Sequence, residues 1–386
     1  MVAALIMWCA ALAAAVWKGS QLARMPRDRG LLIVTICTVL VVAALTAQLM
    51  VSIPVLAGSF PRQAPVLIEF VLLTLFFALL LGLLRSVRAS PTSGARGYVE
   101  LGVALAVSAA LTVIFFGTAL TGGANYGDYT ETAGPAGVLA FHLIGNLYMA
   151  YATAYGACLA WSAAAVSVTP PTRLGLRVAA VGLVICCLGT HLPRVLSTGG
   201  RLLLRTSLVP GTSVWTSPLL AIGVGVFFLG VGYPGARTGI AKARMWVEAR
   251  RHYAQLGPLW TVLYRQFPTI ALFPPSGPAR ERLRLRHMRL RYYRRVIECR
   301  DGLVCLSPYM ATPVRASDSP ARQASLIREA LEHEALDRCA PDGHLAAPSV
   351  IAPPEGTGMD SDVRAILALS RALDRAERAK AGQSTA

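Results

Sequence analysis

Lysine is nearly absent from this chain. Of its 37 Lys and Arg residues, only Lys18, Lys242 and Lys380 are lysines, and none lies in an apolar stretch. A retinal Schiff base needs a lysine within the membrane, so this class of chromophore protein is excluded. The near-exclusive use of arginine, with frequent alanine, is better explained by the codon preference of a GC-rich genome than by selection for bidentate phosphate contacts.

Familiar catalytic motifs are also missing. The sequence contains no H-E-x-x-H, no G-x-S-x-G, no G-x-x-x-x-G-K-S/T and no kinase motif set. Asp360-Ser361-Asp362 has the form of a D-x-D motif, but it stands alone at the start of a predicted helix, where capping explains it more simply. We therefore expect no catalytic residues and no enzymatic activity.

Metal and disulfide patterns are lacking too. Five of the eight cysteines lie in apolar stretches, where they are best explained as small buried hydrophobes. His333, Cys339 and His344 lie near one another in sequence, but their spacing matches no zinc site. No helix-turn-helix or aromatic RNA-binding signature is present either. We expect no metal, no cofactor and no nucleic-acid partner.

What the sequence does contain is a series of seven apolar stretches before residue 235. About 20 apolar residues in a helix match the hydrocarbon thickness of a bilayer, and the backbone must be hydrogen-bonded within each segment. We predict an all-α protein: a seven-helix transmembrane bundle, followed by a small helical cytosolic domain. The predicted spans are 2–17, 31–50, 67–84, 99–120, 136–164, 176–190 and 217–231.

The basic residues between these spans predict the orientation, because short loops rich in Arg and Lys stay in the cytoplasm. Nine basic residues follow spans one, three and five, against four after spans two and six. We therefore expect a cell-membrane protein with its N-terminus outside and its C-terminus in the cytoplasm. The weakest evidence comes from Arg194, Arg201 and Arg205 after span six, because a segment that re-enters the membrane there would change the topology.

We divide the chain into a transmembrane domain at 1–235, a helical cytosolic domain at 236–339, and a flexible linker with a C-terminal helix at 340–386. Span seven is expected to continue as a helix to Gln255, where Gly257-Pro258 breaks it. Further helices are expected at 279–299, 320–338 and 360–380, with a turn at Asp301-Gly302 and a short apolar segment at 303–306.

The helix at 279–299 is basic and amphipathic, which admits three interpretations. Its apolar face can pack into its own domain, or its arginines can contact either lipid phosphates or nucleic acid. We favour packing and keep anionic head groups as the second interpretation, with nucleic acid least favoured. The candidate head-group contacts are Arg244, Arg250, Arg251, Arg286 and Arg289.

The segment from Tyr292 to Leu303, with 306–309 after it and Gly257-Pro258-Leu259-Trp260 before it, resembles the cytosolic domain of an uncharacterised actinobacterial family. Such proteins combine seven predicted spans with a C-terminal domain of unknown function and are often labelled as transporters. The resemblance implies no catalytic or transport residues. Its sharpest part gives a candidate interaction motif for a cytosolic protein partner, formed by Arg294, Arg295, Glu298, Arg300 and Asp301. A helix-end motif held by ion pairs explains the same residues without a ligand.

Polar residues within the spans are the main functional candidates, because burying them in a membrane is costly. Span five carries His142 and Asn146 one turn apart, followed by Tyr148, Tyr151 and Tyr155 at helical spacing. These five residues are the best candidates for a polar cavity, although hydrogen bonds to neighbouring helices and packing of the tyrosines are the favoured explanation. Glu69 and Glu100 lie near span ends and are expected to reach the head groups.

Two functions of different classes fit these features. The first is a non-enzymatic sensor or regulatory protein, in which a membrane bundle is coupled to a cytosolic domain. The alternative is a secondary transporter for an unidentified small solute, which would need a site near the midplane and interrupted helices.

Overall fold

The computed structural model describes residues 2–52, 64–86, 93–119, 135–272, 287–310, 317–337, 350–354 and 358–384, together with residues 312, 314, 315 and 356. All the regular structure in these residues is helical, which confirms the predicted all-α class. The chain forms two compact units, Met1–Arg237 and Thr238–Ala386. We had placed this boundary at residue 235.

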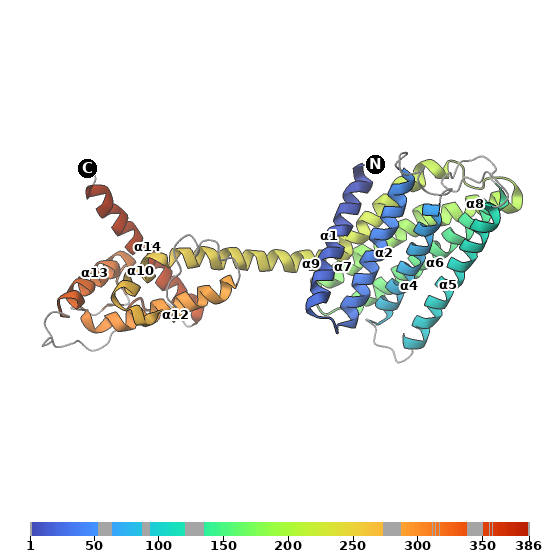
Figure 1. Cartoon of the computed structure of the whole chain (residues 1–386). Coiled ribbons are helices and arrows are strands. Elements are labelled where there is room, and N and C mark those ends of the chain that lie inside the picture. Colours follow the sequence, from blue (N-terminus) through green and yellow to red (C-terminus); the bar gives the residue numbers. More distant parts are fainter. Residues whose placement is uncertain are drawn as a thin grey trace. The chain divides into compact units, whose positions relative to one another are not determined.

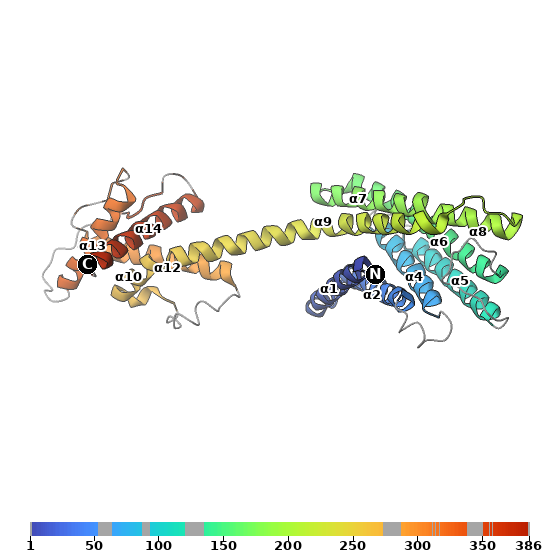
Figure 2. The ribbon, with the colours of Figure 1, turned by 90° about the horizontal axis from the view of Figure 1, so that it is seen from above.

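The first unit is a helical bundle (Figure 1). Helices α1, α2, α4 and α5 pack side by side in the order in which they occur in the chain. Helix α6 packs against α4 and α5 on one side and against α7 and α8 on the other. Figure 2 shows the row of α1, α2, α4 and α5, with α7, α8 and the first part of α9 along the opposite side. The bounds are α1 Val2–Arg24, α2 Arg29–Ser52, α4 Ala64–Ser86, α5 Ser93–Ala119, α6 Ala136–Val166, α7 Pro170–Cys186, α8 Leu192–Leu204 and α9 Thr212–Gln255.

Five segments of this unit are long and apolar enough to cross a membrane, which indicates a multi-pass membrane protein. They are Gly30–Met50, Ala64–Ser86, Tyr98–Thr118, Pro170–Leu204 and Val214–Gln255. The other two predicted spans form α1 and α6. Helix α6 carries a histidine, an asparagine and three tyrosines, and neighbouring helices cover it on several sides.

The predicted sixth span does not end at Thr190. Helix α7 passes into a π-helical turn, η1 (Cys187–His191), and then directly into α8, so that the segment is helical from Pro170 to Leu204. Pro193 at the start of α8 has no N–H to donate back into the preceding turn. A π-turn beside a proline is a typical interruption of a long helix.

Helices α7 and α9 pack at backbone contact. A Cβ atom added to Gly182 would lie 2.4 Å from the backbone nitrogen of Phe227, and one added to Gly230 would lie 2.3 Å from that of Ala179. Only glycine allows two helices to approach so closely. From the sequence we expect Gly223, Gly225, Gly230 and Gly232 to be packing sites. Gly223 and Gly230 do pack against α7, whereas a Cβ added to Gly225 or Gly232 would meet nothing within 4 Å.

Among its described residues, the second unit contains the end of α9 and four further helices around one apolar core. These helices are α10 (Gly257–Gln266), α12 (Met288–Leu306), α13 (Pro320–Asp337) and α14 (Met359–Ser384), with single 3-10 turns η2 (Pro268–Ile270) and η3 (Ser307–Tyr309). The fully buried core side chains include Leu256, Leu259, Leu263, Leu306, Ile327 and Ile366. The predicted continuation of span seven to Gln255 is confirmed.

One predicted local feature of this unit is wrong. Residues Asp301-Gly302 form no turn, because α12 continues through them to Leu306. Gly302 is instead a packing position, where an added Cβ would lie 3.0 Å from two carbon atoms of Leu263. The beginning of the predicted helix, 279–286, lies outside the described residues.

The C-terminal helix also differs from our division of the chain. We had separated 340–386 from the cytosolic domain, yet α14 supplies Ile366, Leu367 and Leu373 to the same core as α10 and α12. The periodicity predicted the helix itself, but could not show that its apolar face packs on residues a hundred positions earlier.

Candidate functional site

The five polar residues predicted to share one cavity lie in two separate groups. Asn146 faces His191 of η1 and the ring of His142 lies against Phe70 of α4, whereas the three tyrosines contact residues of α4 and α5. The difference arises because successive turns of α6 pack against different neighbours. We call the first group the His191 cluster and the second the Glu100 cluster.

The His191 cluster comprises Asn146, Thr190, His191, Arg194 and Thr216. Nδ1 of His191 lies 3.2 Å from the amide oxygen of Asn146, and the amide nitrogen of Asn146 donates to the carbonyl of His142 at 2.8 Å. Because an amide oxygen can only accept, Nδ1 of His191 carries a proton. His142, Asn146 and His191 are all buried.

Helix α9 supplies the other side of this cluster. Arg194 Nε donates to the hydroxyl of Thr216 at 2.9 Å, and one of its terminal nitrogens donates to the hydroxyl of Ser217 at 3.2 Å. Thr190 donates to the carbonyl of Thr216 at 3.1 Å. The π-turn therefore places two successive side chains, Thr190 and His191, against different helices.

The cluster brings together a guanidinium, an imidazole, an amide and several hydroxyls from α6, the η1–α8 segment and α9. Such a set can bind a small polar molecule or pass a proton, and it can equally hold the helices together.

The Glu100 cluster comprises Arg85, Glu100, Tyr151 and Tyr155. Arg85 forms an ion pair with Glu100 at 2.7 Å and donates from Nε to the hydroxyl of Tyr155 at 3.1 Å. Tyr151 donates to the same Glu100 oxygen at 2.7 Å. The second carboxylate oxygen of Glu100 is buried and accepts no hydrogen bond from the residues that the structure describes. Tyr148, one turn earlier on α6, donates instead to the carbonyl of Thr74 at 3.1 Å.

Glu100 therefore does not reach the head groups as we expected. Glu100 is only 4% exposed, because its carboxylate forms an ion pair with Arg85 inside the bundle. Sequence analysis missed Arg85, which we had counted only as a loop charge, and it left His191 and Arg194 at a span end. A signal was available for both arginines, since Arg85 directly follows a predicted span and Arg194 lies four residues after another.

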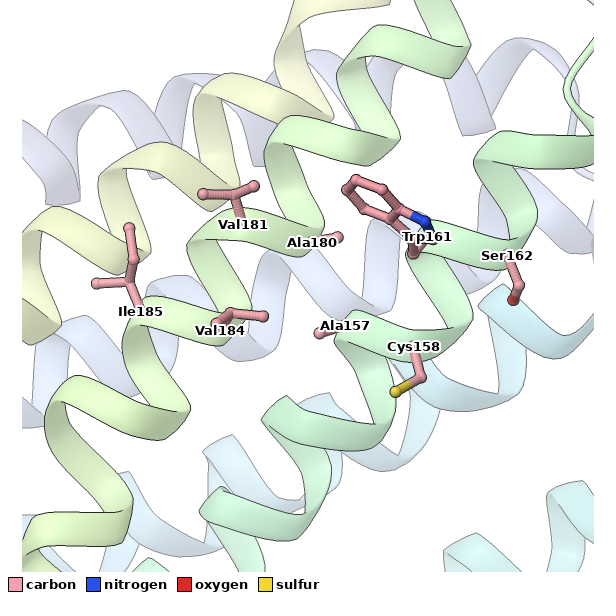
Figure 3. Close-up of a pocket in the computed structure, with 8 residues that line it drawn as sticks. All are labelled: Ala157, Cys158, Trp161, Ser162, Ala180, Val181, Val184 and Ile185. Carbon is pink, nitrogen blue, oxygen red and sulfur yellow. The ribbon is translucent and has the colours of Figure 1, made fainter.

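An apolar groove of about 510 Å³ lies between α6 and α7. Figure 3 shows its walls, formed by Ala157, Cys158, Trp161 and Ser162 of α6 and by Ala180, Val181, Val184 and Ile185 of α7. The hydroxyl of Ser162 is already bound to the carbonyl of Leu159. Specific ligand pockets need several converging polar groups, so the two polar clusters are better candidates than this groove.

In the second unit, the predicted interaction motif is mainly structural. Glu298 is buried, where it accepts from Arg294 Nε at 2.8 Å and from the indole nitrogen of Trp260 at 2.7 Å. The guanidinium of Arg295 lies 3.9 Å from the ring centre of Tyr253 and 4.5 Å from that of Trp260. These contacts join α9, α10 and α12.

Of the two remaining residues of the motif, Arg300 is structural and Asp301 is exposed. Arg300 donates to the carbonyls of Ile351 and Ala352 at 2.6 and 3.0 Å and forms an ion pair with Asp362. Asp301, which we expected to pair with Arg300 or to cap a turn, is exposed within α12. Arg300 thus fixes the start of α14, and Asp301 is left on the surface.

Two titratable groups of α12 are perturbed by burial. Burial raises the pKa of the Cys299 thiol to about 12, with Arg295 acting in the opposite direction. Burial likewise raises the pKa of Tyr292, helped by Tyr293 and by the carboxylates of Glu248 and Asp360. Since the thiolate is the reactive form, Cys299 is a core residue rather than a nucleophile.

The candidate head-group contacts have different surroundings. Arg244 and Arg251 are exposed on α9, and Arg250 lies 5.5 Å from the ring centre of Trp246. Arg289 is exposed and lies 3.4 Å from the hydroxyl of Tyr293. Arg286 lies outside the described residues, as do Cys339 and His344. Within the part of the chain that is described, no three His, Cys, Asp or Glu residues group as metal ligands would.

Comparison with known proteins gives one match. Residues 245–376 match a family of unknown function, DUF6545, and this range lies wholly within the second unit. No curated protein and no solved structure matches the chain. The C-terminal part is therefore a domain of unknown function that follows a set of membrane-type helices.

Proposed function

We propose that this protein is a non-enzymatic sensor of the cell membrane, in which the helical bundle controls the C-terminal domain. The observation that carries this proposal is the double role of α9. Its first residues, Thr216 and Ser217, bind Arg194 in the His191 cluster, and its last residues, 245–255, belong to the domain of unknown function. A change of charge or a ligand at the cluster acts directly on the helix that enters that domain.

Contacts at both ends of α9 support this coupling. In the bundle, Gly230 of α9 lies against Ala179 of α7, the helix that continues into η1 and His191. In the second unit, the carbonyl of Gln255 accepts from Ser370 of α14 at 2.7 Å, and Tyr253 stacks on Arg295 of α12. Any displacement of α9 therefore has to be accommodated in both units.

The charge pattern supports an orientation with the C-terminus in the cytoplasm. Arg194 binds two hydroxyl groups of α9, so it is not a charge of an outside loop, and this weakens the evidence for the opposite topology. The exposed Arg244 and Arg251 then meet anionic lipid head groups or a cytosolic protein partner. A reporter fused after residue 386 should be active only in the cytoplasm, and activity outside would contradict this orientation.

The test of coupling uses hydrogen exchange on the full-length protein in lipid nanodiscs. His191→Ala and Asn146→Ala should change amide protection in the second unit, at 245–255 and in α14, while the protein remains folded. The matched control is Trp161→Ala, which alters an exposed side chain on the same helix as Asn146. Unchanged protection of the second unit in both cluster variants would contradict the sensor.

A secondary transporter is the second candidate, favoured by one observation. The segment Pro170–Leu204 is interrupted by a π-turn and a proline where it meets polar side chains, as in transporters with broken helices. Uptake of a solute by proteoliposomes, lost in His142→Ala and Asn146→Ala but retained when 238–386 is deleted, would favour transport. A sensor predicts the reverse: no uptake, and loss of the cellular phenotype on that deletion.

A further inference from the structure

An apolar stripe runs along the exposed side of α12. Leu290, Ile297 and Val304 are 70%, 55% and 62% exposed, whereas Val296, Cys299 and Leu303 of the same helix are buried in the core. The three exposed residues are seven positions apart. On a helix such residues lie almost in line, drifting by only about 20° per repeat.

The width of this stripe indicates what covers it. It is one residue wide, with Arg294 and Asp301 on one flank and Tyr293 and Arg300 on the other. A helix that lies in a lipid interface needs a much broader apolar face, and an acidic flank is unfavourable beside anionic lipid. A narrow seam with a seven-residue repeat is typical of helix pairing.

The stripe is also complementary to itself. When two copies of α12 pack antiparallel about Ile297, Leu290 of each copy lies opposite Val304 of the other. The same arrangement places each Arg294 opposite the other copy's Asp301, because equivalent flanks face each other in an antiparallel pair. A two-fold symmetric interface requires this self-complementarity.

The contacts within one copy favour the antiparallel direction over the parallel one. In a parallel pair, Asp301 would face the flank of Tyr293 and Arg300, but Arg300 is bound to Ile351, Ala352 and Asp362 of its own domain. In the antiparallel pair, Asp301 instead approaches Arg294 of the other copy, and the attraction between these opposite charges requires no unoccupied donor.

We propose that the occupant of this face is a second copy of the same chain, so that the protein dimerises through antiparallel α12 helices centred on Ile297. The dimer would bring two C-terminal domains together. This dimer extends the proposed sensor function, because the bundle could then switch the C-terminal domain between monomer and dimer. The evidence for the dimer comes from α12 alone.

Disulfide trapping in the full-length protein tests both the contact and its direction. In a background where Cys9, Cys158, Cys305 and Cys339 are changed to Ser, Ile297→Cys should give a disulfide-linked dimer under mild oxidation. Leu290→Cys alone should not, because two such residues would lie about 21 Å apart along the helix axes at about 1.5 Å per residue. Combining Leu290→Cys with Val304→Cys should restore the dimer.

The background protein itself must remain monomeric on a non-reducing gel. Absence of a dimer with Ile297→Cys would overturn the proposal, and efficient cross-linking of Leu290→Cys alone would overturn the antiparallel arrangement.

A second measurement avoids cysteine chemistry. Mass photometry in nanodiscs or detergent should show a dimer that weakens about tenfold in Asp301→Arg and less in Asp301→Asn, because only the first adds repulsion opposite Arg294. A chain that is monomeric at every concentration would refute the dimer. The sensor function would still be testable by hydrogen exchange, so the two proposals fail separately.

Discussion

At the residue scale, the features that distinguish this protein are charges held inside a bundle of membrane-type helices. The side chains of Arg85 and Glu100 are 12% and 6% exposed, and Tyr151 and Tyr155 complete their hydrogen bonding. The cost of taking both ions out of water is offset only while each has its partner. The pair therefore fixes the relative position of α4 and α5, which are consecutive in the chain, and ties both to α6.

Loss of one member of this pair should be far more damaging than loss of both. Arg85→Met leaves an uncompensated buried carboxylate and should destabilise the protein by about 3–5 kcal/mol. Arg85→Met combined with Glu100→Gln should recover most of that loss, because no buried charge remains. Unfolding in mixed micelles measures the difference.

The matched control for this prediction is Arg378→Met. Arg378 pairs with Asp374 on α14, but its side chain is 79% exposed, so the effect should stay below about 1 kcal/mol. Equal destabilisation by Arg85→Met and by the double variant would show that the ion pair is not what holds this end of the bundle.

At the element scale, the pairing of α7 with α9 is set by glycine. The contact atoms at Gly182 and Gly230 are backbone atoms of the opposite helix, which cannot move aside as a flexible side chain can. The η1 turn that follows α7 and the helix α9 carry Thr190 and Thr216 of the His191 cluster. The glycine contacts and the hydrogen bond from Thr190 to Thr216 therefore hold the same helical segments together.

Two glycines of α9, two residues apart, should respond in opposite ways to the same substitution. Gly230→Ala places a methyl group 2.3 Å from the backbone of Ala179 and should destabilise the bundle by about 1–3 kcal/mol. At Gly232 an added Cβ meets nothing within 4 Å, so Gly232→Ala should be neutral or stabilising by up to about 1 kcal/mol through helix propensity. Thermal unfolding in one detergent compares them, and a stable Gly230→Ala variant would contradict close contact.

At the scale of the whole molecule, the chain contains two separately cored units that share one helix. The core of the second unit is built from α10, α12, α13 and α14 together with Leu256, and no buried residue of the first unit belongs to it among those described. The family match covers this unit alone. Such an arrangement is that of a membrane bundle to which an autonomous domain is attached.

The second unit should therefore fold without the bundle. Residues 238–386 should give a helical circular-dichroism spectrum and one cooperative unfolding transition, whereas 238–354, which lacks α14, should not. Removing α14 deletes Ile366, Leu367, Leu369 and Leu373 from the core. At about 1.5–3 kcal/mol for each buried aliphatic side chain, that loss is comparable with the whole stability of a typical domain, about 5–15 kcal/mol. A 238–354 fragment as stable as the longer one would refute the role of α14.

The sequence by itself determined the helical class, the membrane-type helices, the continuation of α9 to Gln255, the helix at 288–299 within α12, and the existence of α13 and α14. These properties follow from hydropathy, helical periodicity and breakers such as Gly257-Pro258, all of which act over a few turns. It also identified His142 and Asn146 as polar residues inside the bundle.

Only the tertiary structure decided which residues meet. Arg85 reaches Glu100, Asn146 reaches His191, and Arg300 reaches Asp362 because distant helices pack side by side. The same packing separates Tyr151 from Asn146 and keeps α12 helical through Asp301 and Gly302, where local rules predicted a turn. Periodicity reports which face of a helix is apolar, but it carries no information on which neighbour covers that face.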